Sequence, residues 1–210
     1  MYKLWIANKN YSSWSLRPWV LLKVLQIPFE ENLCLFENGK SSHEKFSRFS
    51  PTGLVPCLID ENQTIWDSLA ICEYIAEDFP QVWPKDRKAR AWARSASAEM
   101  HSGFSALRQQ CPMDGAHNAP LNNIPIELQT DLNRLQKLWQ DGLNQFGGPW
   151  LAGSEFTAVD AFFAPVAFRI RSYHLPVNPA AKQWVDRVLV LPAMKEWHDA
   201  GLQEPNIEHL

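Results

Sequence analysis

The amino-acid sequence predicts a small α/β domain followed by an all-helical domain. Strand-like and helix-like patterns alternate up to about residue 80, whereas we find no convincing strand after residue 87. A proline-rich stretch, residues 79–86, separates the two halves and is typical of a linker. The length of 210 residues fits two small domains, and a hydrophobic fraction of 46% is typical of a chain that buries a core.

The first domain, residues 1–80, is predicted to follow the order β-α-β-α-β-β-α. Apolar, β-rich runs predict the strands, and a polar turn joins the last two into a hairpin. Apolar residues at helical spacing predict the helices, the third of them with Ser68 as its N-cap. The predicted strands cover residues 3–7, 31–36, 54–60 and 64–66, and the predicted helices cover residues 16–25, 44–49 and 68–78.

The second domain, residues 88–210, follows a linker at residues 81–87 and is predicted to be helical. Its longest irregular segment, residues 112–125, is rich in Gly, Asn and Pro. Thr157 and Asp160 match a capping box in which Asp replaces the usual Glu, and we assign them a structural role. The predicted helices cover residues 89–107, 127–146, 157–173, 180–189 and 192–200.

Composition and charge exclude several classes of function. A formal net charge of -3 argues against a dedicated nucleic-acid-binding protein. The chain starts without a signal-peptide pattern, and its longest apolar run, residues 161–168, is too short to span a membrane, so we expect a soluble cytoplasmic protein. The cysteines are scattered and the histidines lack metal-ligand spacing, which predicts buried free thiols and no metal site.

Hydroxyl side chains gather just before the first predicted helix, in the segment Tyr11-Ser12-Ser13-Trp14-Ser15. A helix N-terminus offers unpaired N–H groups and a partial positive charge, which stabilise an anion and lower the pKa of a thiol. A serine hydroxyl there can donate a hydrogen bond to a thiolate. Alone, the pattern is more typical of an ordinary N-cap.

Two further patterns have the chemistry of a peptide-binding site. Val55 precedes Pro56 at a strand entry, and if the bond between them is cis, the Val55 backbone can pair with an extended peptide. Asp67 and Ser68 lie at the start of the third predicted helix, where N–H groups can bind a ligand carboxylate and Asp67 can accept from an ammonium group. Each pattern alone also fits a strand-entry proline or a capped helix.

The ordered set of these motifs resembles the cytosolic glutathione S-transferase family over essentially the whole chain. The resemblance implies a thioredoxin-like N-terminal domain joined to an α-helical domain, and glutathione as the co-substrate. It implies an enzyme that activates the thiol of glutathione for addition to a small hydrophobic electrophile, bound in a cleft near residues 98–110 and 168–173. It also implies a homodimer.

The resemblance assigns roles to individual residues. Val55 would bind the cysteinyl backbone of glutathione beside a cis Pro56, while Asp67 and Ser68 would hold its γ-glutamyl end. Lys40 would reach the glycine carboxylate.

The segment Ser12-Ser13-Trp14-Ser15 resembles the Ser-Ser-Cys-Ser of the zeta class. Matching by position makes Ser12 the catalytic serine, with Ser13 as a near alternative. Tyr11 is a third candidate, as in tyrosine-type relatives.

The sequence departs from the zeta pattern at two points. Trp14 replaces the zeta cysteine, and matching through Pro165 puts Ser172, rather than the nearby Arg169 or Arg171, at the position that binds the substrate carboxylate. Both departures weaken an assignment as maleylacetoacetate isomerase. A zeta-type cis–trans isomerase and a non-catalytic interaction or stress protein with the same fold remain as alternatives.

The 10 tryptophans are expected to divide between the core and the site. We expect Trp14, Trp19 and Trp66 near the glutathione site. The residues expected in the core or at the domain junction are Trp5, Trp83, Trp139, Trp184 and Trp197.

Overall fold

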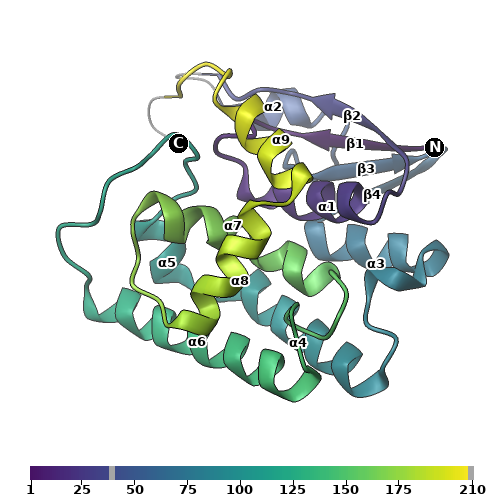
Figure 1. Cartoon of the computed structure of the whole chain (residues 1–210). Helices are drawn as coiled ribbons and strands as arrows, with labels where there is room; N and C mark the ends of the chain where they lie inside the picture. Colours follow the sequence, from purple (N-terminus) through teal and green to yellow (C-terminus); the bar gives the residue numbers. More distant parts are fainter. Residues whose placement is uncertain (38–40, 208–210) are drawn as a thin grey trace.

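The computed structural model describes residues 1–37 and 41–207, and its element order confirms the predicted fold class. A four-stranded sheet with three helices comes first, and a helical domain follows it (Figure 1). The strands are β1 (Tyr2–Ile6), β2 (Phe29–Leu33), β3 (Cys57–Asp60) and β4 (Gln63–Trp66), and the helices are α1 (Ser13–Val24), α2 (Ser42–Phe46) and α3 (Ser68–Asp78).

The sheet has the strand order β2-β1-β3-β4. Strand β1 pairs in parallel with β2 and antiparallel with β3, so that Leu4 lies opposite Glu31 on one side and Leu58 on the other. The predicted hairpin is confirmed, because β3 and β4 pair antiparallel with Asp60 opposite Gln63. In Figure 1, α1 and α3 lie on the side of the sheet that faces the helical domain.

Helix α1 starts earlier than predicted, and α3 has a different N-cap from the predicted one. Helix α1 begins at Ser13 rather than at residue 16, because Ser12 acts as the N-cap and accepts a hydrogen bond from the Ser15 N–H. Helix α3 has Asp67 as its N-cap, and Ser68 is its first residue. The prediction of Ser68 as the cap was therefore wrong by one residue, because the Asp67 carboxylate caps the free N–H groups of the first turn.

The predicted linker packs against the rest of the protein instead of extending into solvent. It contains a short 3₁₀ helix, Pro80–Val82, and both Val82 and the following Trp83 are buried. Trp83 therefore lies at the junction, as expected, with the Arg94 guanidinium 5.3 Å from the centre of its ring. The exact domain limits stay a prediction.

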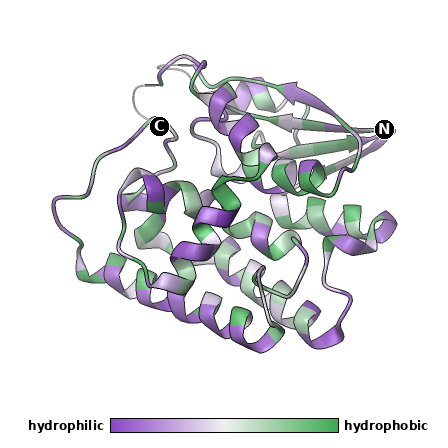
Figure 2. Ribbon diagram, in the orientation of Figure 1, coloured by the Kyte–Doolittle hydropathy of each residue, from purple (hydrophilic) through white to green (hydrophobic). Residues whose placement is uncertain are grey.

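The helical domain contains α4 (Arg87–Ser102), α5 (Ser105–Gln110), α6 (Ile126–Phe146), α7 (Ala158–Ser172), α8 (Pro179–Leu189) and α9 (Pro192–Gly201). The single helix predicted over residues 89–107 is in fact two helices. The break falls at Gly103 and Phe104, where Phe104 has a φ of 55° and leaves the right-handed helical region. Figure 2 shows alternating hydrophobic and hydrophilic stretches along α6, as expected for a helix with one buried face.

Helix α7 forms the centre of the helical domain and packs on α1, α4 and α8. Nearly all of its residues are buried, including the charged Asp160. The predicted capping box at Thr157 and Asp160 is present, with the Thr157 N–H donating to Asp160 Oδ2 at 3.1 Å. Asp160 Oδ1 accepts from the Leu151 N–H and from the Trp184 indole, so this carboxylate joins α7, α8 and the loop before α7.

The tryptophans and cysteines follow the expectations with three exceptions. Trp5, which was expected in the core, is half-buried and stacks on Phe49 with ring centres 4.2 Å apart. Trp139, Trp184 and Trp197 are fully buried core residues, as expected. Trp19 is also fully buried and packs edge-on against Trp197, so the expectation that it lies at the site was wrong. All four cysteines are free, but Cys34 is only half-buried, whereas the other three are buried.

Candidate functional site

The turn between β1 and α1 holds the candidate serines. The Ser12 N–H donates to the Asn8 carbonyl at 2.8 Å, which directs the chain into the helix. The Ser12 hydroxyl donates to Ser15 Oγ at 2.7 Å, and Ser15 Oγ also accepts from the Ala7 N–H at 3.2 Å. Ser12 is therefore part of a buried hydrogen-bond chain that joins the end of β1 to the first turn of α1.

Ser13 differs from Ser12 in its hydrogen bonding. Both side chains line a cavity of about 450 Å³ at the start of α1. Within the described residues, the Ser13 hydroxyl makes no hydrogen bond, so its proton is free for a ligand. Tyr11 lines the same cavity, and its hydroxyl accepts from the Ile207 N–H at 3.3 Å.

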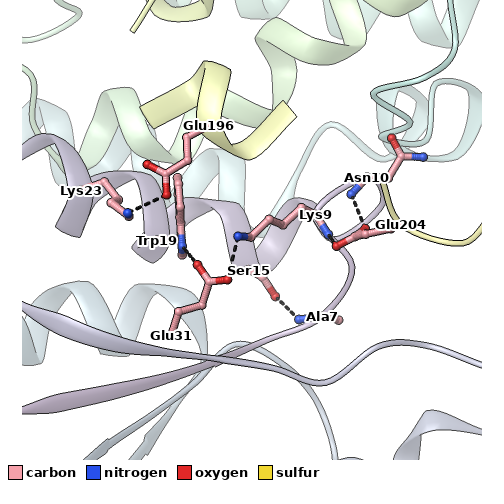
Figure 3. A network of polar contacts seen from close by, with 9 residues as sticks. All are labelled: Ala7, Lys9, Asn10, Ser15, Trp19, Lys23, Glu31, Glu196 and Glu204. Atoms are coloured by element: carbon pink, nitrogen blue, oxygen red, sulfur yellow. Dashed lines mark hydrogen bonds and ion pairs between the residues drawn. The ribbon is translucent and has the colours of Figure 1, made fainter. Parts of the chain in front are cut away.

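The turn is anchored by carboxylates from distant parts of the chain, as Figure 3 shows. Glu204, beyond α9, accepts from the backbone N–H groups of Lys9 and Asn10 at 2.8 and 3.1 Å. The buried Lys9 ammonium lies 2.7 Å from Glu31, which also accepts from the Trp19 indole at 2.6 Å. The backbone that leads to Ser12 is thus held by β2 on one side and by the C-terminal segment on the other.

The Val55–Pro56 bond is cis, as the resemblance implied. Strand β3 starts directly after Pro56, at Cys57. Gly53 in the preceding loop has a φ of 63°, and a Cβ atom there would lie 2.5 Å from the His43 ring. The left-handed backbone favours glycine at this position, which shapes the loop that presents Val55.

Asp67 and Ser68 lie beside this loop. A cavity of about 270 Å³ is lined by both, by Val55 and Pro56, and by Trp14 from the start of α1. Asp67 Oδ1 accepts from the Leu69 and Ala70 N–H groups, and Asp67 Oδ2 lies 3.2 Å from His101 Nε2. The structure therefore brings four predicted binding residues together, although they come from two separate segments of the chain.

Trp14 links three cavities. It lines the cavity of Asp67 and Ser68, the serine cavity, and a third cavity of about 450 Å³ that reaches the helical domain. The third cavity is lined by Tyr11, Ser13, Trp14, Arg108, Pro112, Met113, Asp114, Arg169 and Tyr173. These include members of both stretches, 98–110 and 168–173, that the resemblance placed beside the electrophile.

Three arginines of the site carried no sequence motif. Arg17 is fully buried in α1, with its guanidinium 4.0 Å from the Trp14 ring centre and its Nη1 3.5 Å from Ser68 Oγ. Burial, followed by the positive charges of Arg108 and Arg169, lowers the pKa of Arg17. Its Nε and Nη2 have no hydrogen-bond partner among the described residues.

Arg108 and Arg169 bring positive charge to the third cavity. In the described part of the chain, their guanidinium groups donate to backbone carbonyl oxygens, those of Met100, Gly103 and Cys111 among them. Burial lowers the pKa of Arg169 to about 10, and that of Arg108 is lowered for the same reason. Both remain cationic near neutral pH and attract an anion to this cavity.

One predicted site residue lies outside the described part of the chain. Lys40 falls in the segment 38–40, outside the described residues. Within the described ranges, no cluster of three or more His, Cys, Asp or Glu residues is arranged to hold a metal ion. The helices of these ranges include none with the length and apolar character of a membrane span.

The two-domain fold, the cis proline and the paired residues at α3 together define a protein of the glutathione-transferase type. Family models for the N-terminal and C-terminal domains of glutathione S-transferases match residues 11–78 and 90–200, respectively. The chain therefore belongs to the glutathione S-transferase family.

Individual relatives support this assignment. A probable maleylacetoacetate isomerase of Caenorhabditis elegans is 27% identical over 85% of this chain and 82% of its own length. The glutathione S-transferase GstB of Escherichia coli K12 is 24% identical over 93% of this chain and 97% of its own length. A Burkholderia glutathione transferase homolog, solved with bound glutathione, superposes with a TM-score of 0.72 at 23% identity and covers 97% of this chain and 99% of its own; this likeness shows the shared fold.

Proposed function

We propose that this protein is a glutathione transferase that binds glutathione in the adjoining cavities at the start of α1. The observation that carries the proposal is that three segments, distant in the sequence, line two adjoining cavities. The serine turn, the Val55 loop and the start of α3 line two cavities that share Trp14, Leu54 and Val55. A tripeptide with charges at its ends and a thiol at its centre fits this arrangement.

The residues suggest how glutathione lies. Asp67 would accept from the γ-glutamyl ammonium, while the hydroxyl and backbone N–H of Ser68 would bind the γ-glutamyl carboxylate. The Val55 backbone would pair with the cysteinyl residue, which directs the thiol toward the start of α1. Lys40 is kept as the candidate for the glycine carboxylate, on the resemblance alone.

The start of α1 would stabilise the thiolate. The helix N-terminus supplies partial positive charge, and a serine hydroxyl donates to the sulfur, so the thiol loses its proton to solvent more readily. The sulfur then attacks an electrophilic carbon, a C–S bond forms, and the leaving group departs with the electron pair of the broken bond. Fixing both reactants in adjoining cavities supplies the orientation that the reaction needs.

The hydrogen bonds favour Ser13 over Ser12 as the donor to sulfur. Ser12 uses its hydroxyl proton on Ser15 and caps the helix, whereas the Ser13 hydroxyl is free within the described chain. Ser12 would then act by shaping the turn. Tyr11 lines the same cavity and remains the third candidate.

Separate substitutions of the two serines test this assignment. Titration of bound glutathione by thiolate absorbance should show a thiol pKa raised by about 1 unit in Ser13→Ala, equivalent to ~1.4 kcal/mol. Ser12→Ala should lower the free energy of unfolding by ~1 kcal/mol through loss of the cap, with a smaller change in the thiol pKa. If neither variant changes the thiol pKa, the serine assignment is wrong; if the wild type does not bind glutathione, the proposed function is wrong.

The arginines of the third cavity favour a second candidate function, glutathione-dependent cis–trans isomerisation. Arg108 and Arg169 would hold an anionic electrophile such as a cis-enoate, and several relatives are named maleylacetoacetate isomerases. In that reaction the thiolate adds to the alkene and its π electrons move onto the conjugated carbonyl. Rotation about the new single bond and loss of the thiolate then regenerate glutathione. Trp14 replaces the zeta cysteine here, which favours transfer over isomerisation.

Substrate choice separates the two candidates. Isomerisation predicts turnover of a maleyl compound and little turnover of an aromatic halide, whereas transfer to hydrophobic electrophiles predicts the reverse. For an anionic substrate, Arg169→Met should raise KM at least tenfold, because a charged hydrogen bond contributes ~1.5–3 kcal/mol. A cytoplasmic homodimer, expected from the sequence and the resemblance, completes the proposal.

A further inference from the structure

Asp67 is held from both domains of the protein. Its Oδ1 accepts from the Leu69 N–H at 2.8 Å and from the Ala70 N–H at 3.4 Å, which are contacts within its own helix. Its Oδ2 lies 3.2 Å from Nε2 of His101, which is on α4 in the helical domain. The Asp67 side chain is still 44% exposed, so the carboxylate can be oriented by the protein and reached by a ligand at the same time.

The surroundings of His101 indicate its protonation state. Its Nδ1 is buried and has no hydrogen-bond partner among the described residues. Burial lowers the pKa of His101, the charges of Arg17 and Arg108 lower it further, and the charge of Asp67 opposes them. The neutral ring with its proton on Nε2 satisfies these contacts, because a proton on Nδ1 would be buried without an acceptor.

Aromatic side chains fix the His101 ring in place. Trp14 of α1 meets it edge-on, with ring centres 5.1 Å apart, and Phe162 of α7 lies at 6.3 Å. Trp14 lines the Asp67 cavity as well. His101 therefore contacts α1, α7 and the start of α3, and any shift of α4 against the sheet domain changes its distance to Asp67.

We propose that His101 is a positioning residue that donates a hydrogen bond from Nε2 to Asp67 and orients this carboxylate toward the γ-glutamyl ammonium of glutathione. This inference rests on the proposed function. It makes the affinity for glutathione depend on how the two domains are packed, because the donor and the acceptor belong to different domains. No sequence motif marks His101, since its role comes from a contact across the domain junction.

Two substitutions separate the hydrogen bond from the packing of the ring. His101→Leu keeps an apolar side chain against Trp14 and Phe162 but removes the donor. His101→Gln keeps an N–H donor near the position of Nε2. Arg94→Leu is a matched control, because Arg94 also joins α4 to α3, through a 2.9 Å ion pair with Glu73, and does not contact Asp67.

The ligand provides the second half of the test. Dissociation constants are measured by calorimetry for glutathione and for glutaryl-cysteinyl-glycine, the analogue without the γ-glutamyl amino group. His101→Leu should bind glutathione about tenfold more weakly and the analogue less than about twofold more weakly, because only glutathione offers the ammonium that Asp67 accepts from. His101→Gln should recover most of the glutathione affinity, and Arg94→Leu should bind both ligands like the wild type.

The outcomes are distinguishable from a failure of the proposed function. If the wild type binds glutathione and His101→Leu loses affinity for both ligands equally, or for neither, the inference is overturned. An equal loss in Arg94→Leu would also overturn it, since domain packing alone would then explain the effect. A wild type that does not bind glutathione would overturn the proposed function itself, and the inference with it. Thermal melting of each variant confirms that folded protein is compared.

Discussion

The buried carboxylate of Asp160 should make the stability of this protein depend on pH in a specific way. Asp160 is fully buried in α7 and accepts three hydrogen bonds, from the Leu151 and Thr157 N–H groups and from the Trp184 indole. Burial raises its pKa from 3.8 to about 6, although these hydrogen bonds oppose the rise. The folded protein therefore holds this proton more tightly than the unfolded chain does.

The sign and the magnitude follow from that shift. Between pH 4 and pH 6 the unfolded chain releases the proton before the folded protein does, so stability falls as the pH rises. A difference of about 2 pKa units corresponds to ~3 kcal/mol, present below pH 4 and lost by about pH 7. In Asp160→Asn this contribution is absent, because the amide does not titrate.

The substitution also has a cost that does not depend on pH. The amide oxygen of Asp160→Asn can keep the contacts with Leu151 and Trp184, but its NH₂ group then faces the Thr157 N–H, at a cost of ~1–3 kcal/mol. We therefore expect the variant to be clearly less stable than the wild type at pH 4. The difference in the free energy of unfolding between the wild type and the variant should be ~3 kcal/mol smaller at pH 7 than at pH 4, because the folded wild type no longer gains from binding the Asp160 proton.

Urea unfolding of both proteins from pH 4 to pH 7, at a fixed protein concentration, checks this expectation. Asp186→Asn is the control, since Asp186 is exposed and its ion pair with Lys182 on α8 contributes little to stability. A gap between the wild type and Asp160→Asn that stays constant or widens as the pH rises would refute the reasoning. It would mean that the three N–H donors fully offset the burial of the charge.

Two further predictions concern the anchoring of the serine turn and the packing of the helical domain. Glu204→Ala removes the acceptor for two N–H groups of the turn before α1, and calorimetry should show that glutathione binds about fivefold more weakly. The control is Glu196→Ala, which breaks only a surface ion pair and should leave the affinity for glutathione unchanged. Gly142→Ala adds a Cβ atom 2.3 Å from the Trp92 ring and 2.4 Å from the Leu151 carbonyl. Denaturant unfolding should show that the free energy of unfolding falls by ~1–2 kcal/mol, because overpacking outweighs the gain in helix propensity. An unchanged or higher stability would show that the Trp92 ring and the Leu151 carbonyl move aside at little cost.

Much of the fold could be predicted because its signals are local. The element order and the hairpin followed from apolar periodicity and from turn residues that lie next to one another in the chain. Element ends were less well predicted. The early start of α1 depends on the Ser12–Ser15 hydrogen bond and its link to Ala7. The break at Phe104 is a change of backbone conformation to a φ of 55°. Periodicity reports neither feature.

The residues of the candidate site also fall into those that the sequence identified and those that only the structure identified. Ser12, Ser13, Val55, Asp67 and Ser68 were visible in the sequence, because each belongs to a short motif at a helix start or a strand entry.

Three other residues became visible only when the two domains were placed together: Arg17, His101 and Arg108. Arg169 was considered from the sequence, but matching by position favoured Ser172 instead. Each of the three lies on a helix whose local pattern fits an ordinary structural residue, and each gains its role from a partner more than 30 positions away or from a cavity shared with distant segments. His101, for example, meets Asp67 across the domain junction.

The sequence by itself therefore determined the class of fold, the order of the domains and the motifs of the proposed glutathione site. The tertiary structure decided which charges surround that site and which serine has a free hydroxyl. The physical reason is that periodicity and capping act over a few residues, whereas electrostatics and hydrogen bonding in a buried site depend on distances between segments that only packing brings together.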